Sequence, residues 1–110
     1  MEYSKCLGSF GEEFAVRVLM EMGFVIHDTN YKARHGEIDI IAKKGSTLHF
    51  IEVKTRSTDS CGAPEDAVDD RKLERMKEAA DDYIRRKRPG WRDISFDVFA
   101  ISTDVIWDVA

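Results

Sequence analysis

The sequence predicts an α/β fold, a three-layer α/β/α sandwich in which helices cover both faces of a central mixed β-sheet. Apolar runs of strand length alternate with amphipathic stretches of helix length, in the order helix, three strands, helix, then one or two strands. The predicted strands are apolar enough to need cover on both faces, and flanking helices provide it. The length of 110 residues suits one domain, spanning residues 1–110.

The first predicted helix covers residues 9–22. Its apolar residues recur at the three- and four-residue spacing of one helix face, and Gly23 follows where a helix stop is expected. The residues of this face are Phe10, Phe14, Ala15, Val18, Leu19 and Met22. A short apolar strand is expected at residues 24–27, and the residues after it have the composition of a polar connection.

Two β-rich runs, residues 37–42 and 47–55, are separated by the sequence KKGS. Gly45 can take the positive φ of a tight turn, so we expect the two runs to pair as an antiparallel hairpin.

A loop precedes the second predicted helix, which extends from Pro64 to Arg86. Pro64 suits the first turn of a helix, and Pro89 with Gly90 favours its end. A strand is expected at residues 94–102, and residues 105–109 are a candidate for a last one.

Composition argues against several classes of protein. Hydrophobic residues make up 43% and charged residues 35%, which describes a soluble globular chain and not a disordered one. No apolar run approaches the roughly 18 residues of a membrane span. The first ten residues lack a secretory signal, which favours a cytoplasmic protein. Cys6 and Cys61 form no CxxC pair, so neither a zinc site nor a disulfide scaffold is indicated.

The net charge of −4 argues mildly against a nucleic-acid partner. The basic residues are nevertheless clustered, at residues 34–35, 43–44, 71–77 and 85–92. Because a charge run is usually a solvated helix face, these clusters alone do not decide the partner.

Acidic residues on the two hairpin strands are the strongest functional signal. Side chains alternate along a strand, so Glu37 and Asp39 share one side, as do Glu52 and Lys54. In the obvious register both pairs converge on one patch, where the carboxylates would repel each other and lose hydration. A bound Mg²⁺ ion would offset this repulsion, and it would also activate a water and neutralise charge on a phosphoryl group. Lys54 could orient that water or hold the scissile phosphate.

Two other interpretations stay open. Glu52 and Lys54 can form a plain ion pair on a solvated strand, with Glu37 and Asp39 as the polar half of a half-exposed strand. The chain would then be a protein-interaction domain. Alternatively, it could be a non-catalytic module that binds nucleic acid. The acidic pair on the adjoining strand, with Glu12 or Glu13 on the first helix, favours the metal site.

Four ordered segments resemble the YraN-like family of bacterial proteins of uncertain function: GEEFA at 11–15, GEIDIIA at 36–42, FIEVKTR at 50–56 and GAPEDAVDDRKLERM at 62–76. That family belongs to the restriction-endonuclease-like superfamily, which carries the PD-(D/E)XK nuclease motif, and is similar to archaeal Holliday-junction resolvases. The resemblance implies a nuclease that hydrolyses DNA with Mg²⁺ or Mn²⁺, branched DNA included. A homodimer would suit the symmetric cuts that a junction requires.

The resemblance also implies roles for individual residues. Asp39 and Glu52 match the two metal-binding acids, and Lys54 matches the catalytic lysine. The main-chain carbonyl of Val53 could complete the metal shell, and Glu12 matches a glutamate on the first helix that reaches the same site in related nucleases.

Glu37 and Lys72 are secondary candidates, Glu37 because it shares a face with Asp39 and Lys72 because the family's long helix carries a lysine there. The candidates for nucleic-acid contacts are Arg34, His35, Arg56, Arg71 and Lys72. The loop at residues 57–61 departs from the family pattern, since Cys61 stands before a glycine where an aromatic residue is usual.

Overall fold

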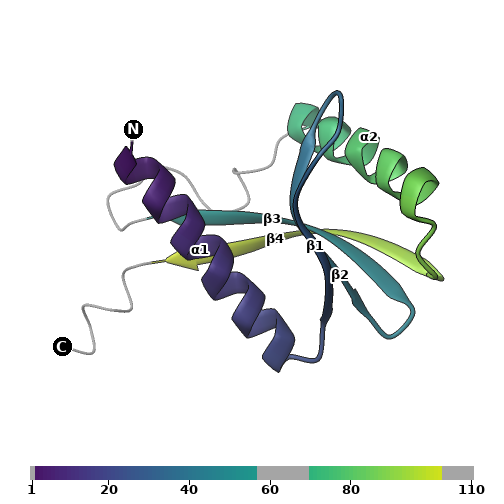
Figure 1. The fold of residues 1–110 in the computed structure, drawn as a ribbon, viewed down its shortest axis with the longest axis horizontal. Helices are drawn as coiled ribbons and strands as arrows, with labels where there is room; N and C mark the ends of the chain where they lie inside the picture. The colour runs from purple at the N-terminus through teal and green to yellow at the C-terminus, as the bar shows by residue number, and fades with distance from the viewer. Residues whose placement is uncertain (1, 57–69, 103–110) are drawn as a thin grey trace.

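The structure is a computed structural model that describes residues 2–56 and 70–102. Its elements are α1 (Glu2–Glu21), β1 (Val25–Lys32), β2 (Glu37–Lys44), β3 (Thr47–Arg56), α2 (Asp70–Lys87) and β4 (Asp93–Ser102) (Figure 1). The strands form one sheet in the order β1-β2-β3-β4. β2 is antiparallel to both β1 and β3, whereas β4 runs parallel to β3. The predicted α/β fold with a central mixed sheet is therefore confirmed.

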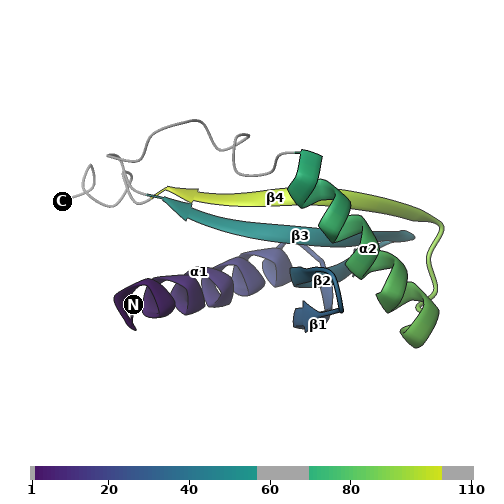
Figure 2. The same cartoon turned by 90° about the horizontal axis from the view of Figure 1, so that it is seen from above.

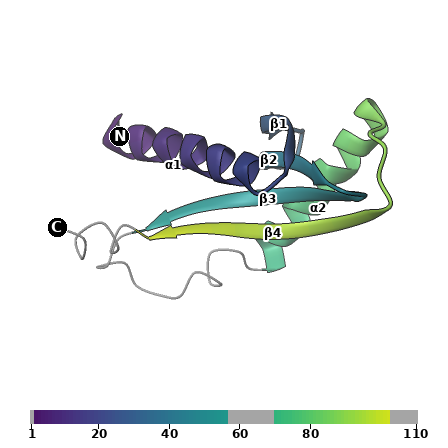
Figure 3. The same cartoon turned by 90° about the horizontal axis from the view of Figure 1, so that it is seen from below.

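Side chains that alternate along the strands build two cores, one on each face of the sheet. Phe50 of β3 packs with Tyr83 of α2 on one face. The adjacent Ile51 packs with Leu19 of α1 on the other face. The helices thus cover opposite faces, as the three-layer prediction required. Figure 1 shows α1 passing across β3 and β4 at an angle, and Figures 2 and 3 show α1 to one side of these strands, with α2 crossing them in Figure 2.

The predicted hairpin is confirmed. β2 and β3 are joined through a tight turn in which Gly45 has a φ of 62°, a conformation that glycine adopts without steric cost. The ladder between these strands runs from Lys44 opposite Thr47 to Ile40 opposite Ile51, where the paired register ends. Beyond that point β3 continues beside β4 and β2 continues beside β1. Figure 1 shows the two halves of the sheet diverging there, and we call this point the fork.

Two predicted boundaries were wrong. α1 begins at Glu2 and not at residue 9, and β1 extends to Lys32 through residues that were expected to form a polar connection. Thr29 pairs with Ile40, and Tyr31 pairs with Ile38. β1 is an edge strand, and an edge strand with exposed positions tolerates polar residues. These polar residues gave the segment the composition of a loop. Residues 64–69 and 105–109, which were assigned to a helix start and a last strand, lie outside the described residues.

Only part of the predicted apolar face of α1 is buried. Ala15 and Leu19 are 0% and 4% exposed, whereas Phe10, Phe14 and Met22 are 61%, 45% and 53% exposed. α1 therefore meets the sheet through Ala15 and Leu19, four residues apart, with the partly buried Val16 beside them. The predicted apolar face was broader than the face that the sheet buries. The small side chain of Ala15 brings the helix close to the strands. None of the described helices is long and apolar enough to cross a membrane.

Candidate functional site

Asp39 and Glu52 lie at the fork, immediately beyond the last paired residues of β2 and β3. Both are almost fully buried, at 9% and 7% exposure. Asp39 Oδ2 accepts a hydrogen bond of 2.8 Å from the main-chain N–H of Val53. An acidic side chain of β2 thus binds the β3 main chain just past the point where the ladder ends. The fork is therefore held in part by a carboxylate.

The surroundings of Asp39 disfavour its charged form. Burial raises the pKa of Asp39 to about 7, although the hydrogen bond from Val53 acts in the opposite direction. The negative charges of Glu52 and Glu12 raise this pKa further, and the positive charge of Lys72 lowers it. A carboxylate in a dominant ion pair would instead have a lowered pKa. Asp39 is therefore a buried acid whose negative charge is incompletely compensated.

Lys72 reaches the same site from α2. Its Nζ lies 2.6 Å from Glu52 Oε2. Burial lowers the pKa of Lys72, but the hydrogen bond and charge of Glu52, followed by the charges of Asp39 and Glu37, outweigh it and raise the pKa overall. The amine is thus held as an ammonium among carboxylates that come from both hairpin strands.

The alternative interpretation, in which Glu52 forms an ion pair with Lys54, is not what the structure shows. Glu52 pairs with Lys72. Lys54 is exposed on β3, and within residues 2–56 and 70–102 its side chain makes no ion pair. Glu52 does lie on the Phe50 side of β3 as expected, because it faces α2, and Val53 packs on the α1 side.

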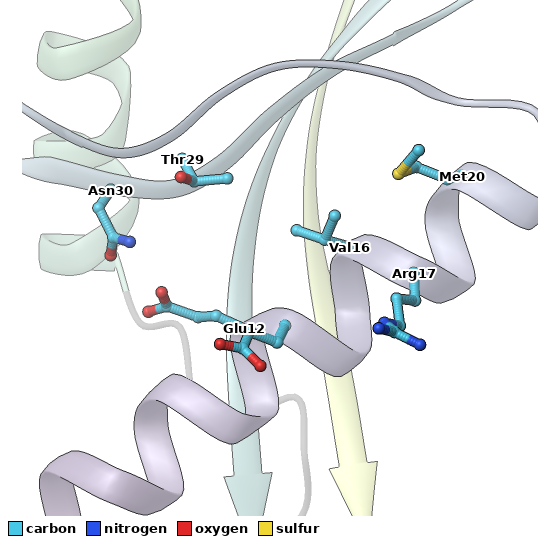
Figure 4. Close-up of a pocket in the computed structure, with 7 residues that line it drawn as sticks. Glu12, Val16, Arg17, Met20, Thr29 and Asn30 are labelled. Atoms are coloured by element: carbon cyan, nitrogen blue, oxygen red, sulfur yellow. The ribbon is translucent and has the colours of Figure 1, made fainter.

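Glu12 approaches from α1, where a cleft of about 530 Å³ separates the helix from β1. Figure 4 shows Glu12 and Val16 on α1 across from Thr29 and Asn30 of β1. The neighbouring Gly11 is buried against the end of β3, and that close contact fixes this turn of the helix. Acidic groups from α1, β2 and β3 therefore act on one another at the fork.

A second cleft, of about 640 Å³, lies between the residues that connect β1 to β2 and the first half of α2. Its basic lining residues are Lys32, Arg34, His35, Lys72 and Arg75, and we call it the basic cleft. Gly36 is packed so tightly against α2 that a Cβ atom would lie 2.4 Å from the main-chain oxygen of Arg75. This contact sets the width of the basic cleft at one end.

The basic cleft contains three of the five predicted nucleic-acid-binding residues, namely Arg34, His35 and Lys72. Arg71 is exposed on α2 and does not line it, and the side chain of Arg56 lies outside the described ones. The sequence interpretation missed Lys32 and Arg75. Arg75 could have been found, because it lies three residues after Lys72 on the same helix face. Lys32 could not, because its strand had been assigned to a loop.

Asp97 of β4 belongs to a separate polar cluster. Its carboxylate lies 2.6 Å from His49 Nδ1 and accepts a hydrogen bond of 2.8 Å from Ser95 Oγ. Because both His49 and Ser95 bind the acid, the imidazole is not placed between serine and aspartate. This arrangement does not activate a serine nucleophile.

Comparison with known proteins identifies the family. Residues 11–101 match the uncharacterised protein family UPF0102. The chain belongs to the UPF0102 family. The UPF0102 protein of Dictyoglomus thermophilum is 46% identical over 98 residues, which cover 89% of this chain and 83% of that protein. The UPF0102 protein of Desulfitobacterium hafniense strain Y51 is 38% identical over 115 aligned positions, covering 96% and 95% of the two chains. That of Rhodococcus opacus is 41% identical over 101 residues, covering 92% and 86%.

UPF0102 membership confirms the resemblance to YraN-like proteins that the four sequence segments indicated. The matched range includes Glu12 on α1, Asp39 and Glu52 at the fork, Lys54 beside them in sequence and Lys72 on α2. The family description assigns no activity.

Proposed function

We propose that this UPF0102 protein is a divalent-metal-dependent nuclease that hydrolyses phosphodiester bonds of DNA, branched DNA included. The meeting of Asp39 and Glu52 at the fork supports the proposal most strongly. Of the two buried carboxylates there, Glu52 forms an ion pair with Lys72, and the pKa of Asp39 is raised to about 7. Such a site gains from a second positive charge, which a divalent cation would supply.

The donor set fits Mg²⁺ or Mn²⁺. Asp39 and Glu52 would hold the ion, with the main-chain carbonyl of Val53 as a third ligand, and water and phosphate oxygens would fill the remaining positions. Among the described residues no group of three or more His, Cys, Asp or Glu side chains could hold a metal. Mg²⁺ commonly binds through one or two carboxylates plus water and substrate, so a two-carboxylate site agrees with its preference. The bound ion would lower the pKa of a water and neutralise phosphoryl charge.

The other residues have roles that their positions support. Glu12 adds negative charge beside Asp39 and so favours a cation there. Lys54 is exposed two residues after Glu52, where its amine is accessible to an attacking water or a scissile phosphate. Arg34 and His35 in the basic cleft would hold the sugar-phosphate backbone next to the fork.

A cleavage panel tests the proposal. Labelled linear duplex, single-stranded, flap and four-way-junction DNA are incubated with the full chain and Mn²⁺, Mg²⁺ or EDTA. We expect metal-dependent cleavage that falls about 100-fold or more in Asp39→Asn, Glu52→Gln and Lys54→Ala. The matched control is Glu74→Gln, an exposed acid on α2, which should cleave like the wild type.

Cleavage that survives unchanged in all three site variants would end the nuclease proposal. DNA binding that needs no metal and leads to no cut on any substrate would favour the non-catalytic module. Retained cleavage in EDTA would likewise contradict a metal-dependent mechanism.

A further inference from the structure

We propose that Lys72 couples metal binding to phosphate binding. A divalent cation at the fork displaces the Lys72 ammonium from Glu52, and the released side chain then binds a phosphate of the nucleic acid in the basic cleft. This inference rests on the proposed metal site and adds an order of events to it.

Lys72 already acts as the cation of the fork. Its Nζ is 2.6 Å from Glu52 Oε2, and the charges of Asp39 and Glu37 also act on it. The three acids come from β2 and β3, whereas the amine comes from α2 on a long flexible stem. The ammonium therefore occupies a position among carboxylates that a metal ion would also favour.

Burial shows which partner of the ion pair can move. The Glu52 side chain is 10% exposed and belongs to a central strand, whereas the Lys72 side chain is 43% exposed at the start of a helix. A divalent ion bound through Glu52 would repel the ammonium that shares this carboxylate. The amine can regain hydration outside the fork, but the carboxylate cannot leave it, so Lys72 is the group that is displaced.

The basic cleft offers the displaced amine a place to go, because Lys72 lines it. Arg34, His35 and Arg75 converge there with Lys72, and Glu37 is its acidic lining residue. While Lys72 neutralises Glu52, its charge is not available to a phosphate. Metal loading releases that charge, so metal and nucleic acid bind with positive cooperativity, and the coupling is reciprocal.

Calorimetry with Mn²⁺ alone tests the first half of the inference on the full chain. Lys72→Gln removes the competing ammonium, so it should bind Mn²⁺ about fivefold more tightly than the wild type, at the low end of usual coupling. Lys72→Arg keeps the charge and should bind Mn²⁺ much like the wild type. Lys77→Gln, an exposed lysine on the same helix, is the matched control and should leave Mn²⁺ affinity unchanged.

Fluorescence anisotropy with a labelled oligonucleotide tests the second half. Ca²⁺ replaces Mn²⁺ so that binding is measured apart from hydrolysis. Ca²⁺ should tighten DNA binding by the wild type and by Lys77→Gln. In Lys72→Gln this enhancement should be smaller, because phosphate can still bind the Ca²⁺ ion but the variant has no amine to release into the basic cleft. An enhancement equal to that of the wild type would overturn the coupling.

A measurement on the wild type avoids any dependence on folding of the variants. The ion pair with Glu52 protects the Lys72 amine from acetylation by a water-soluble reagent, so Mn²⁺ should increase its acetylation rate, as followed by mass spectrometry. Lys77 in the same molecule provides the internal reference.

The outcomes separate the two proposals. Equal or weaker Mn²⁺ binding by Lys72→Gln, or no change in Lys72 acetylation, overturns the coupling. If Asp39→Asn abolishes Mn²⁺ binding in the same experiment, the metal site itself still stands. Mn²⁺ binding that is absent from the wild type, or unaffected by Asp39→Asn, overturns both.

Discussion

Replacement of Asp39 by asparagine tests whether uncompensated charge at the fork destabilises the metal-free protein. The pKa of Asp39 rises from 3.8 to about 7 on folding, mainly because of burial. At about 1.4 kcal/mol per pKa unit, a shift of about 3 units corresponds to about 4 kcal/mol of lost stability when Asp39 is ionised. We take this as an upper bound, because the charge of Glu52 contributes to the same shift. The amide that replaces the carboxylate would carry no charge, and its oxygen could still accept the hydrogen bond from Val53.

Proton linkage determines whether the protein gains or loses stability as the pH rises. Between about pH 4 and pH 7 folded Asp39 retains a proton that the unfolded chain releases. The stabilising effect of this proton is complete below the unfolded pKa and is lost as the pH rises through the folded pKa. Asp39→Asn avoids this loss. Its free energy of unfolding should therefore match that of the wild type near pH 4 and exceed it most at pH 8.

Urea unfolding in EDTA, followed by circular dichroism, measures the difference. With m-values of about 1–3 kcal/mol per molar urea, a gain of 2–4 kcal/mol would move the midpoint by about 1 M or more at pH 8. Excess Mn²⁺ should then stabilise the wild type and not Asp39→Asn. Asp81→Asn, which removes the acid of an exposed ion pair with Arg85, is the control and should change stability by less than about 1 kcal/mol at either pH. An Asp39→Asn protein that is less stable than the wild type at pH 8 would refute the reasoning.

Two further predictions concern the α2 side of the sheet. Gly36→Ala places a Cβ 2.4 Å from the Arg75 main-chain oxygen, so α2 must shift, and urea unfolding should show a loss of about 1–3 kcal/mol. DNA binding should weaken with it, and unchanged stability would contradict the tight packing. Tyr31→Phe removes a hydrogen bond of 2.6 Å to Asp82 Oδ2, which should lower stability by about 0.5–1.5 kcal/mol. Burial and Asp82 raise the pKa of Tyr31 to about 12, so absorbance titration of Tyr31→Phe should show one late-titrating phenol fewer than that of the wild type, and an equal number would refute the assignment.

Strand alternation was enough to predict which side of β3 each side chain near the fork faces. It placed Phe50 and Glu52 on one side of β3 and Ile51 on the other, and the two cores confirm this. The hairpin followed from the same period and from the turn signal at Gly45. These features depend on residues close in sequence, where the chain's geometry leaves few alternatives.

What the sequence could not predict depends on how distant elements meet. The ladder between β2 and β3 ends at Ile40 and Ile51, so that Asp39 binds the Val53 N–H, and this follows from the divergence of the sheet. In the same way, the only lysine that the sequence placed beside Glu52 was Lys54, which is two residues away. The amine that contacts Glu52 is that of Lys72, which comes from the distant helix α2.

A divalent cation is proposed to bind between the two buried acids, Asp39 and Glu52. Anomalous diffraction from a crystal grown with Mn²⁺ tests it directly. We predict an anomalous peak bonded to a carboxylate oxygen of Asp39 and one of Glu52, with Lys72 Nζ moved off Oε2. A fork without a peak under saturating Mn²⁺, or a peak held by other residues alone, would contradict the account.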